Sequence, residues 1–130
     1  MTDVDRLVLN VEDDETLRQI VSRHLRSRGY EVTEASSAEA AVRALEGARH
    51  PDVVLLDLNL PGDNGWDLLR GTAIAGAGSP PVIITSATTV SPKRLAEFGC
   101  AGFLPKPFPL DTLVATIERV IQPKGGVDPG

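Results

Sequence analysis

The stretch Asp52-Val53-Val54-Leu55-Leu56-Asp57 decides the fold of this chain. Side chains along a strand point alternately to its two faces, so an unbroken apolar run predicts a strand that is buried on both faces. Such strands are typical of the centre of a parallel sheet that helices cover on both sides. A carboxylate, Asp57, stands where this strand ends, and a turn cluster follows at residues 61–65.

The segments on either side repeat this pattern of a short apolar run and a longer amphipathic one. Strands are predicted at 7–11, 30–35, 52–56, 81–85 and 102–104, and helices at about 14–28, 38–47, 66–70, 92–98 and 110–121. Asp14 is expected to cap the first helix, and Ser36 with Glu39 has the spacing of a capping box for the second. Five strands that alternate with five helices predict an α/β fold with one parallel sheet.

Length and composition narrow the class of protein. The chain has 130 residues, which suits one domain over 1–122, and the Gly- and Pro-rich segment 123–130 is predicted to be a tail or linker. A net charge of -5 argues against a nucleic-acid-binding surface. The single cysteine excludes an internal disulfide, and neither a signal sequence nor a membrane-spanning run is visible, so a cytoplasmic location is expected.

Polar residues follow several predicted strands at the edge where open parallel sheets bind ligands. Glu12 and Asp13 follow the first strand and Asp57 follows the third. Ser86 follows the fourth strand, and Lys106 comes just after the fifth. Three carboxylates, a hydroxyl and an ammonium group are therefore expected to converge at one edge of the sheet.

This set of groups predicts a site for Mg²⁺ and for phosphoryl transfer. Mg²⁺ prefers oxygen ligands, which Asp13, Asp57 and the backbone carbonyl of Asn59 could supply, while Glu12 could hold a bound water. The cation would relieve the repulsion between the carboxylates. Asp57 could then act as a carboxylate nucleophile toward a phosphoryl donor, with Mg²⁺, Lys106 and the Ser86 hydroxyl offsetting charge on the transferred group.

Four motifs, each at the carboxyl end of a predicted strand, resemble the response-regulator receiver family. The resemblance covers the chain from about Arg6 to Ile121 and implies a flavodoxin-like sheet with strand order 2-1-3-4-5. The motifs are Val11-Glu12-Asp13-Asp14, Leu55-Leu56-Asp57-Leu58-Asn59-Leu60-Pro61-Gly62, Thr85-Ser86-Ala87 and Lys106-Pro107-Phe108.

The resemblance also implies a role for each matching residue. Asp57 corresponds to the phosphorylated aspartate, Glu12 and Asp13 to the acidic metal-site pair, Lys106 to the basic residue, and Ser86 with Phe103 to the switch pair. The Lys106-Pro107 bond is expected to be cis. Asn59 and Thr88 occupy the positions that tune loss of the phosphoryl group.

The function that the resemblance implies is signalling. A histidine kinase or histidine phosphotransfer protein would phosphorylate Asp57, and the face formed by the fourth helix, fifth strand and fifth helix would change for an output protein or a homodimer. Contact with nucleic acid or a membrane is not expected. The fourth helix is predicted to be short, since residues 87–91 form helix weakly.

Two other functions compete with this one. A phosphatase of the haloacid-dehalogenase type needs a second aspartate two residues after the nucleophile, and Asn59 stands there. A receiver-like module that is never phosphorylated would not need the complete set of acidic, hydroxyl and basic residues. The sequence leaves open whether the domain is a stand-alone regulator or part of a longer protein.

Overall fold

The computed structural model describes residues 6–47, 49–60 and 80–121. The helix predicted at 66–70 and the segment 123–130 lie outside these residues. The five predicted strands are all present, and each lies within about one residue of its predicted bounds. They are β1 (Leu7–Val11), β2 (Glu31–Ala35), β3 (Val53–Asp57), β4 (Val82–Ser86) and β5 (Gly102–Pro105).

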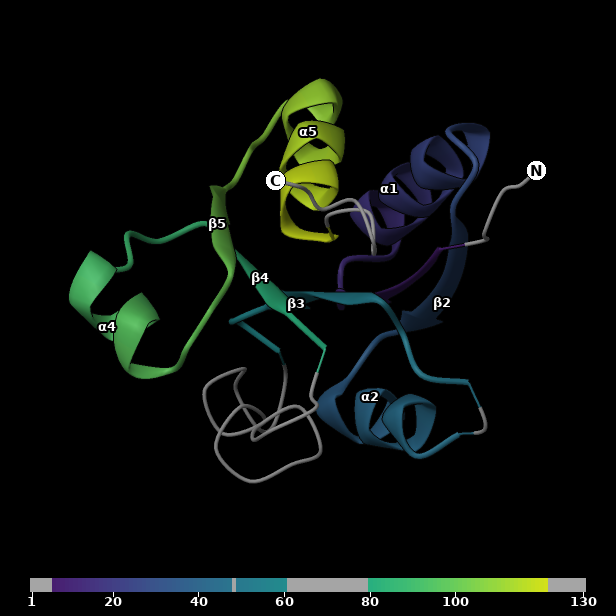
Figure 1. Cartoon of the computed structure of the whole chain (residues 1–130), viewed down its shortest axis with the longest axis horizontal. Coiled ribbons are helices and arrows are strands. Elements are labelled where there is room, and N and C mark those ends of the chain that lie inside the picture. Colours follow the sequence, from purple (N-terminus) through teal and green to yellow (C-terminus); the bar gives the residue numbers. More distant parts are fainter. Residues whose placement is uncertain (1–5, 48, 61–79, 122–130) are drawn as a thin grey trace, which may run out of the picture.

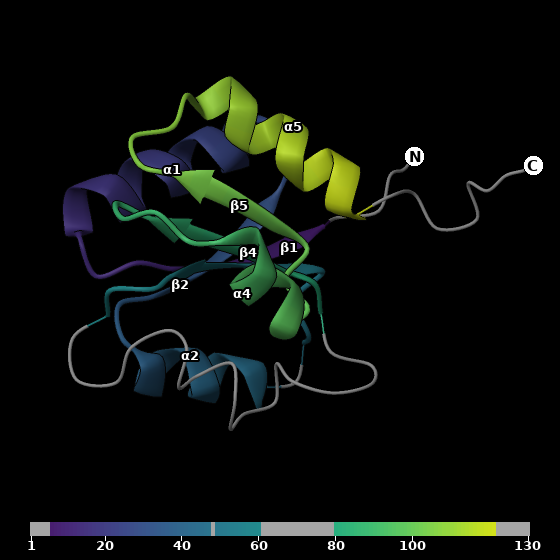
Figure 2. The ribbon, with the colours of Figure 1, turned by 90° about the vertical axis from the view of Figure 1, so that its left-hand side faces the viewer.

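The strands form one parallel sheet with the order β2-β1-β3-β4-β5, which confirms the predicted topology. Its interior strands β1, β3 and β4 are buried along their whole length. Figure 1 shows α1 (Glu15–Ser27) and α5 (Leu110–Ile121) on one face of the sheet and α2 (Ala38–Leu45) on the other. The view at right angles in Figure 2 shows the same three layers. Side chains that alternate along each strand divide the core between these two faces.

One core cluster lies between the sheet and α1 with α5, and it contains Val8, Leu55 and Ile83 from the strands. The other contains Leu9, Leu56 and Ile84 together with the apolar side of α2. Residues adjacent in one strand thus enter different clusters, as the predicted burial on both faces requires. Phe98, which ends the short helix α4 (Pro92–Glu97), packs on the second cluster.

The ends of the helices test the local predictions. Asp14 caps α1 as expected and accepts a hydrogen bond from the Leu17 N–H at 3.1 Å. The predicted cap of α2 is wrong by one residue, because Ser37 and not Ser36 accepts from the Ala40 N–H. No glutamate then occupies the third helical position, so the capping box does not form. α4 begins at Pro92 and has six residues, which confirms that it is short.

Candidate functional site

The parallel register places two buried carboxylates at the same level of the sheet. Val11 in β1 is paired with Leu56 in β3, so the next residues, Glu12 and Asp57, leave adjacent strands side by side. Carboxylate oxygens of Glu12, Asp13 and Asp57 lie within 4.8 Å of one another. Asp57 is 1% exposed and Glu12 is also buried, whereas Asp13 is exposed. The acidic cluster predicted from sequence is therefore present.

Lys106 supplies the positive charge of the cluster. Its Nζ lies 2.8 Å from Glu12 Oε1 and 3.4 Å from Asp57 Oδ1. The backbone brings it there, because the Lys106 N–H continues the β4–β5 ladder by donating to the Ser86 carbonyl at 2.8 Å. The Lys106-Pro107 bond is cis, as expected. One ammonium group thus lies between two buried acids from neighbouring strands.

Backbone N–H groups also fix the orientation of both buried acids. Asp57 Oδ1 accepts from the Asn59 N–H at 3.0 Å, and Glu12 Oε2 accepts from the Asp14 N–H at 3.2 Å. Hydrogen bonds of this kind stabilise the charged form of a carboxylate. The short loops after β1 and β3 therefore fix the orientation of the Glu12 and Asp57 carboxylates.

Burial and repulsion nevertheless make the charged state of the cluster costly. Burial is the largest effect and, with repulsion from Asp57, raises the pKa of Glu12 to about 7, although Lys106 and the Asp14 N–H oppose the rise. Burial lowers the pKa of Lys106, but hydrogen bonding and attraction from Glu12 and Asp57 outweigh it and raise that pKa overall. Additional positive charge at this edge would relieve the remaining imbalance.

The two expected switch residues lie in β4 and β5. Ser86 is fully buried beside Lys106, and its Oγ lies 2.9 Å from Thr88 Oγ1 and accepts from the Thr88 N–H at 3.0 Å. Phe103 pairs in register with Ile84 and is half-buried against the core on the α2 side. The expected roles of both residues, and of the Asn59 carbonyl as a ligand, stay predictions.

Arg18, whose role no sequence motif indicates, contacts the acidic loop from α1. Its Nη1 donates to the Glu12 carbonyl at 2.9 Å, and its Nε donates to Glu34 Oε1 at 3.1 Å. Sequence shows only a basic residue one turn after the helix cap, a common feature of solvent-exposed helix positions. The acidic residue Glu34 was the one sequence signal for a partner of Arg18, but the two residues are far apart in the sequence.

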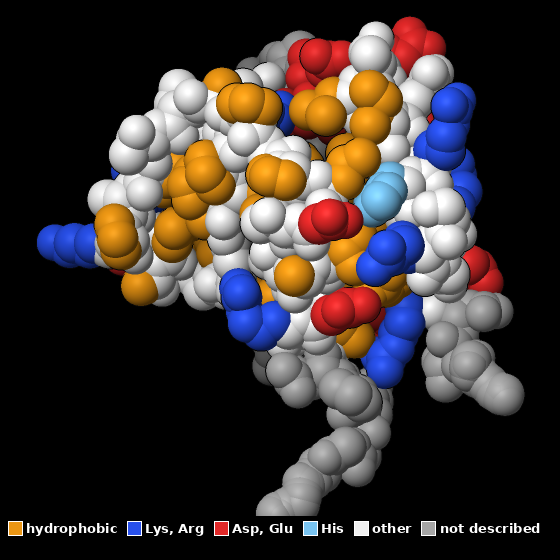
Figure 3. Space-filling model, turned by 90° about the horizontal axis from the view of Figure 1, so that it is seen from above, with side chains coloured by type: hydrophobic (Ala, Val, Ile, Leu, Met, Phe, Trp, Pro, Cys, Tyr) orange, Lys and Arg blue, Asp and Glu red, His pale blue; other side chains and the backbone are white. Residues whose placement is uncertain are grey.

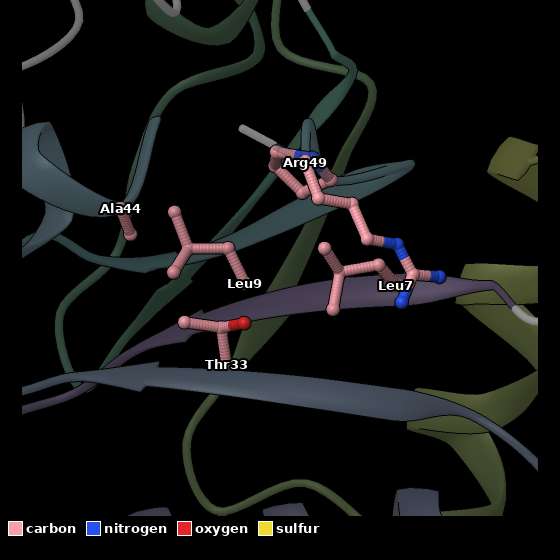
Figure 4. A pocket seen from close by; sticks show the side chains of 6 residues that line it. Leu7, Leu9, Thr33, Ala44 and Arg49 are labelled. Carbon is pink, nitrogen blue, oxygen red and sulfur yellow. The ribbon is translucent and has the colours of Figure 1, made fainter. Parts of the chain in front are cut away.

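The surface around the cluster differs from the other end of the sheet. Figure 3, which views the α1 and α5 side, shows acidic side chains gathered at one edge beside hydrophobic ones. At the opposite end of β1, a pocket that opens to solvent is lined by Leu7, Leu9, Thr33, Ala44, Arg49 and Pro51 (Figure 4). Its one charged side chain, Arg49, is paired with Glu31, so the acidic edge is the better candidate.

The fold and this edge together identify the class of protein. The model of the family described as "Response regulator receiver domain" matches residues 8–118, and the chain belongs to that family. It is therefore a receiver domain of the kind found in two-component response regulators, which is not a conventional enzyme. None of the helices in the described residues has both the length and the apolar character that a membrane-spanning helix needs.

The chain is similar in sequence and structure to several known response regulators and receiver domains. It is 36% identical over 119 residues to the transcriptional regulatory protein KdpE of Mycobacterium tuberculosis, covering 89% of this chain and 51% of that protein. The receiver domain of the hybrid histidine kinase CckA is 36% identical with a TM-score of 0.74, covering 89% of this chain and 99% of the other. The HemR receiver domain of Leptospira biflexa is 33% identical with a TM-score of 0.79, covering 97% and 99%. The chain spans about half the length of the curated relatives it matches.

The raised pKa of Glu12 predicts a pH-dependent stability for the metal-free protein. Because the folded-state pKa of about 7 exceeds the ordinary value of 4.5, the neutral acid favours folding below pH 4.5, and this contribution is lost as the pH rises through 7. Each pKa unit corresponds to about 1.4 kcal/mol, so the loss is at most about 3.5 kcal/mol.

Urea unfolding in EDTA, from pH 4.5 to 8, measures this contribution. The free energy of unfolding of Glu12→Gln, relative to wild type, should increase over that range, since glutamine stays neutral and keeps an acceptor oxygen for Lys106. If the free energies of unfolding of the two proteins change with pH in parallel, the pKa of Glu12 is not raised in the folded state.

Proposed function

We propose that Asp57 accepts a phosphoryl group, in a reaction that requires a divalent cation, from a phosphohistidine of a histidine kinase or histidine phosphotransfer protein. The observation that carries the proposal is the grouping of Asp57 with Glu12 and Asp13 within 4.8 Å, next to the Lys106 ammonium group. Buried carboxylates that repel one another are stable only with a positive partner, and Lys106 supplies one charge for three acids.

The donor atoms of the cluster fit Mg²⁺ in particular. All three side chains offer carboxylate oxygens, which are the hard ligands that Mg²⁺ binds with some of its waters retained. Asp13 and Asp57 are the proposed direct ligands together with the Asn59 carbonyl, and Glu12 would hold a metal-bound water. A bound Mg²⁺ would neutralise negative charge on the phosphoryl oxygens during transfer.

The protein's own residues would carry out the rest of the transfer. A carboxylate oxygen of Asp57 forms a bond to phosphorus while the bond from phosphorus to the donor's histidine nitrogen breaks. The Asn59 N–H and Lys106 already contact Asp57 Oδ1, so they hold the nucleophile in one orientation. Lys106 would then pair with the transferred phosphoryl group, whose charge exceeds that of the carboxylate it replaces.

The signal would pass through Ser86 to the face formed by α4, β5 and α5. The Ser86 hydroxyl is buried and currently bonded to Thr88, so turning it toward a phosphoryl group would break that contact. Phe103 packs on the same core cluster as Leu95 and Phe98 at α4, which supports coupled movement. An output protein or a second copy of this domain would bind the changed face.

The limits and location of the domain are also proposals. We assign residues 1–122 to the receiver domain and 123–130 to a tail or linker, and we place its action in the cytoplasm, where the family resemblance implies that its kinase partner phosphorylates it. KdpE is a transcriptional regulator by name, so an output through a transcription-regulating segment is one form this signalling could take. The domain itself, with its acidic net charge, is proposed not to bind nucleic acid.

Asp57→Asn tests the phosphorylation site. Wild type treated with acetyl phosphate and Mg²⁺ should gain the mass of one phosphoryl group in intact-mass spectrometry, and Asp57→Asn should gain none, because an amide is not a nucleophile here. Asp111→Asn, which removes an exposed acid at the start of α5, should be labelled like wild type. Label that persists in Asp57→Asn, or no label in wild type, would refute the assignment.

Beryllofluoride, which mimics a phosphoryl group on aspartate, tests the proposed homodimer. In sedimentation velocity, wild type with beryllofluoride and Mg²⁺ should sediment as a larger species than the untreated protein, while Asp57→Asn should not change. A wild type that binds beryllofluoride and stays monomeric would contradict the homodimer and leave a separate output protein as the partner.

A further inference from the structure

Arg18 joins the loop that carries the acidic cluster to the helix and strand beside it. Its side chain is only 15% exposed, which is low for an arginine on a helix surface. The guanidinium donates Nη1 to the backbone carbonyl of Glu12 at 2.9 Å and Nε to Glu34 Oε1 in β2 at 3.1 Å. One planar group therefore bonds both the acidic loop and the neighbouring strand.

A buried amide holds Arg18 itself in place. Asn10 in β1 is 3% exposed, and its Nδ2 donates to the Arg18 carbonyl at 3.2 Å and to Ser22 Oγ at 3.1 Å. Ser22 is fully buried. Buried hydrogen bonds of this kind are costly to leave unmade, so they tie α1 to the strand that precedes Glu12.

Arg18 supplies the backbone hydrogen bond that the sheet does not provide to Glu12. The Glu12 N–H still donates to the Ala35 carbonyl of β2 at 2.9 Å, but the β1 register with its neighbours ends at Val11. The Glu12 carbonyl therefore receives its hydrogen bond from Arg18. With both backbone groups of Glu12 held, the peptide that links it to Asp13 has a fixed orientation, and the side chains of both acids start from fixed positions.

We propose that Arg18 is a positioning residue for divalent-cation binding, acting through the Glu12 carbonyl. This inference rests on the proposed function, since it assumes that Glu12 and Asp13 serve a cation. The positive charge of Arg18 is paired with Glu34, so its contribution is orientation and not neutralisation of the cluster. Loss of such an orienting contact typically weakens metal binding about 10- to 100-fold.

Arg26 offers a matched control on the same helix. Its guanidinium also pairs with Glu34, with Nη1 3.8 Å from Oε2, and Nη2 donates to a backbone carbonyl, that of Val32, at 3.2 Å. Within the described residues, Arg26 forms no hydrogen bond or ion pair with Glu12, and its side chain is 53% exposed. Removing Arg26 therefore removes the same kinds of contact between α1 and β2 without changing the acidic loop.

The test is the Mg²⁺ affinity of the unphosphorylated chain by isothermal titration calorimetry. Arg18→Ala should weaken binding about 10-fold or more, and Arg26→Ala should bind like wild type. Arg18→Lys should fall between, because lysine keeps the charge but cannot bond both acceptors with one planar group. In phosphorylation by acetyl phosphate, Arg18→Ala should need more Mg²⁺ for half-maximal rate while its rate at saturating Mg²⁺ stays close to wild type.

Equal Mg²⁺ affinity in Arg18→Ala and wild type would overturn the role of Arg18, as would an equal loss in Arg18→Ala and Arg26→Ala. Full affinity in Arg18→Lys would show that charge alone matters and would overturn it too. A wild type that binds no Mg²⁺ would instead remove the proposed function. If urea unfolding shows that Arg18→Ala is not folded, Arg18→Lys against Arg26→Lys makes the same comparison.

Discussion

The contact on which the site depends is the one between Lys106 and two buried carboxylates. Like charges about 4 Å apart repel by about 4 kcal/mol at the effective dielectric of a protein surface. Lys106 lies 2.8 Å from Glu12 and 3.4 Å from Asp57 and attracts both. Burial, together with repulsion from Asp57, still raises the pKa of Glu12 to about 7. Such a site favours the binding of a second cation, and its electrostatics would respond to a change in the charge on Asp57.

The fold brings these groups together through the geometry of parallel strands. Glu12, Asp57 and Ser86 lie at one edge because β1, β3 and β4 end at the same level, and Lys106 follows β5 by the same rule. Apolar side chains on both faces prevent the strands from shifting register, since a slip of one residue would turn each side chain to the opposite face. The core therefore determines the distances between the site residues.

Sequence was sufficient for the features that follow from this rule. The acidic cluster and its proximity to Lys106 could be predicted because they depend on where buried strands end, whereas the strand order was implied by the family resemblance. The exact start of a helix was harder to predict. Ser36 and Ser37 could each cap α2, and the structure shows that Ser37 does so. His24 lies among arginines in the sequence, a pattern typical of a solvent-facing helix position, yet it is half-buried with an unbonded Nε2 in the part of the chain that the structure describes. Arg18 could not be found from sequence because both acceptors depend on how α1 lies against the sheet.

The most direct test of the account is the position at which a divalent cation binds. Mn²⁺ can replace Mg²⁺ at oxygen-ligand sites, and it broadens the NMR signals of nearby nuclei. In ¹⁵N-labelled wild type, trace Mn²⁺ should broaden the amide signals of residues 12–14, 57–59 and 106 first, and Asp57→Asn should reduce this broadening. Broadening centred on exposed acids elsewhere, such as Glu46 or Glu118, with residues 12–14 and 57–59 unaffected, would contradict the account.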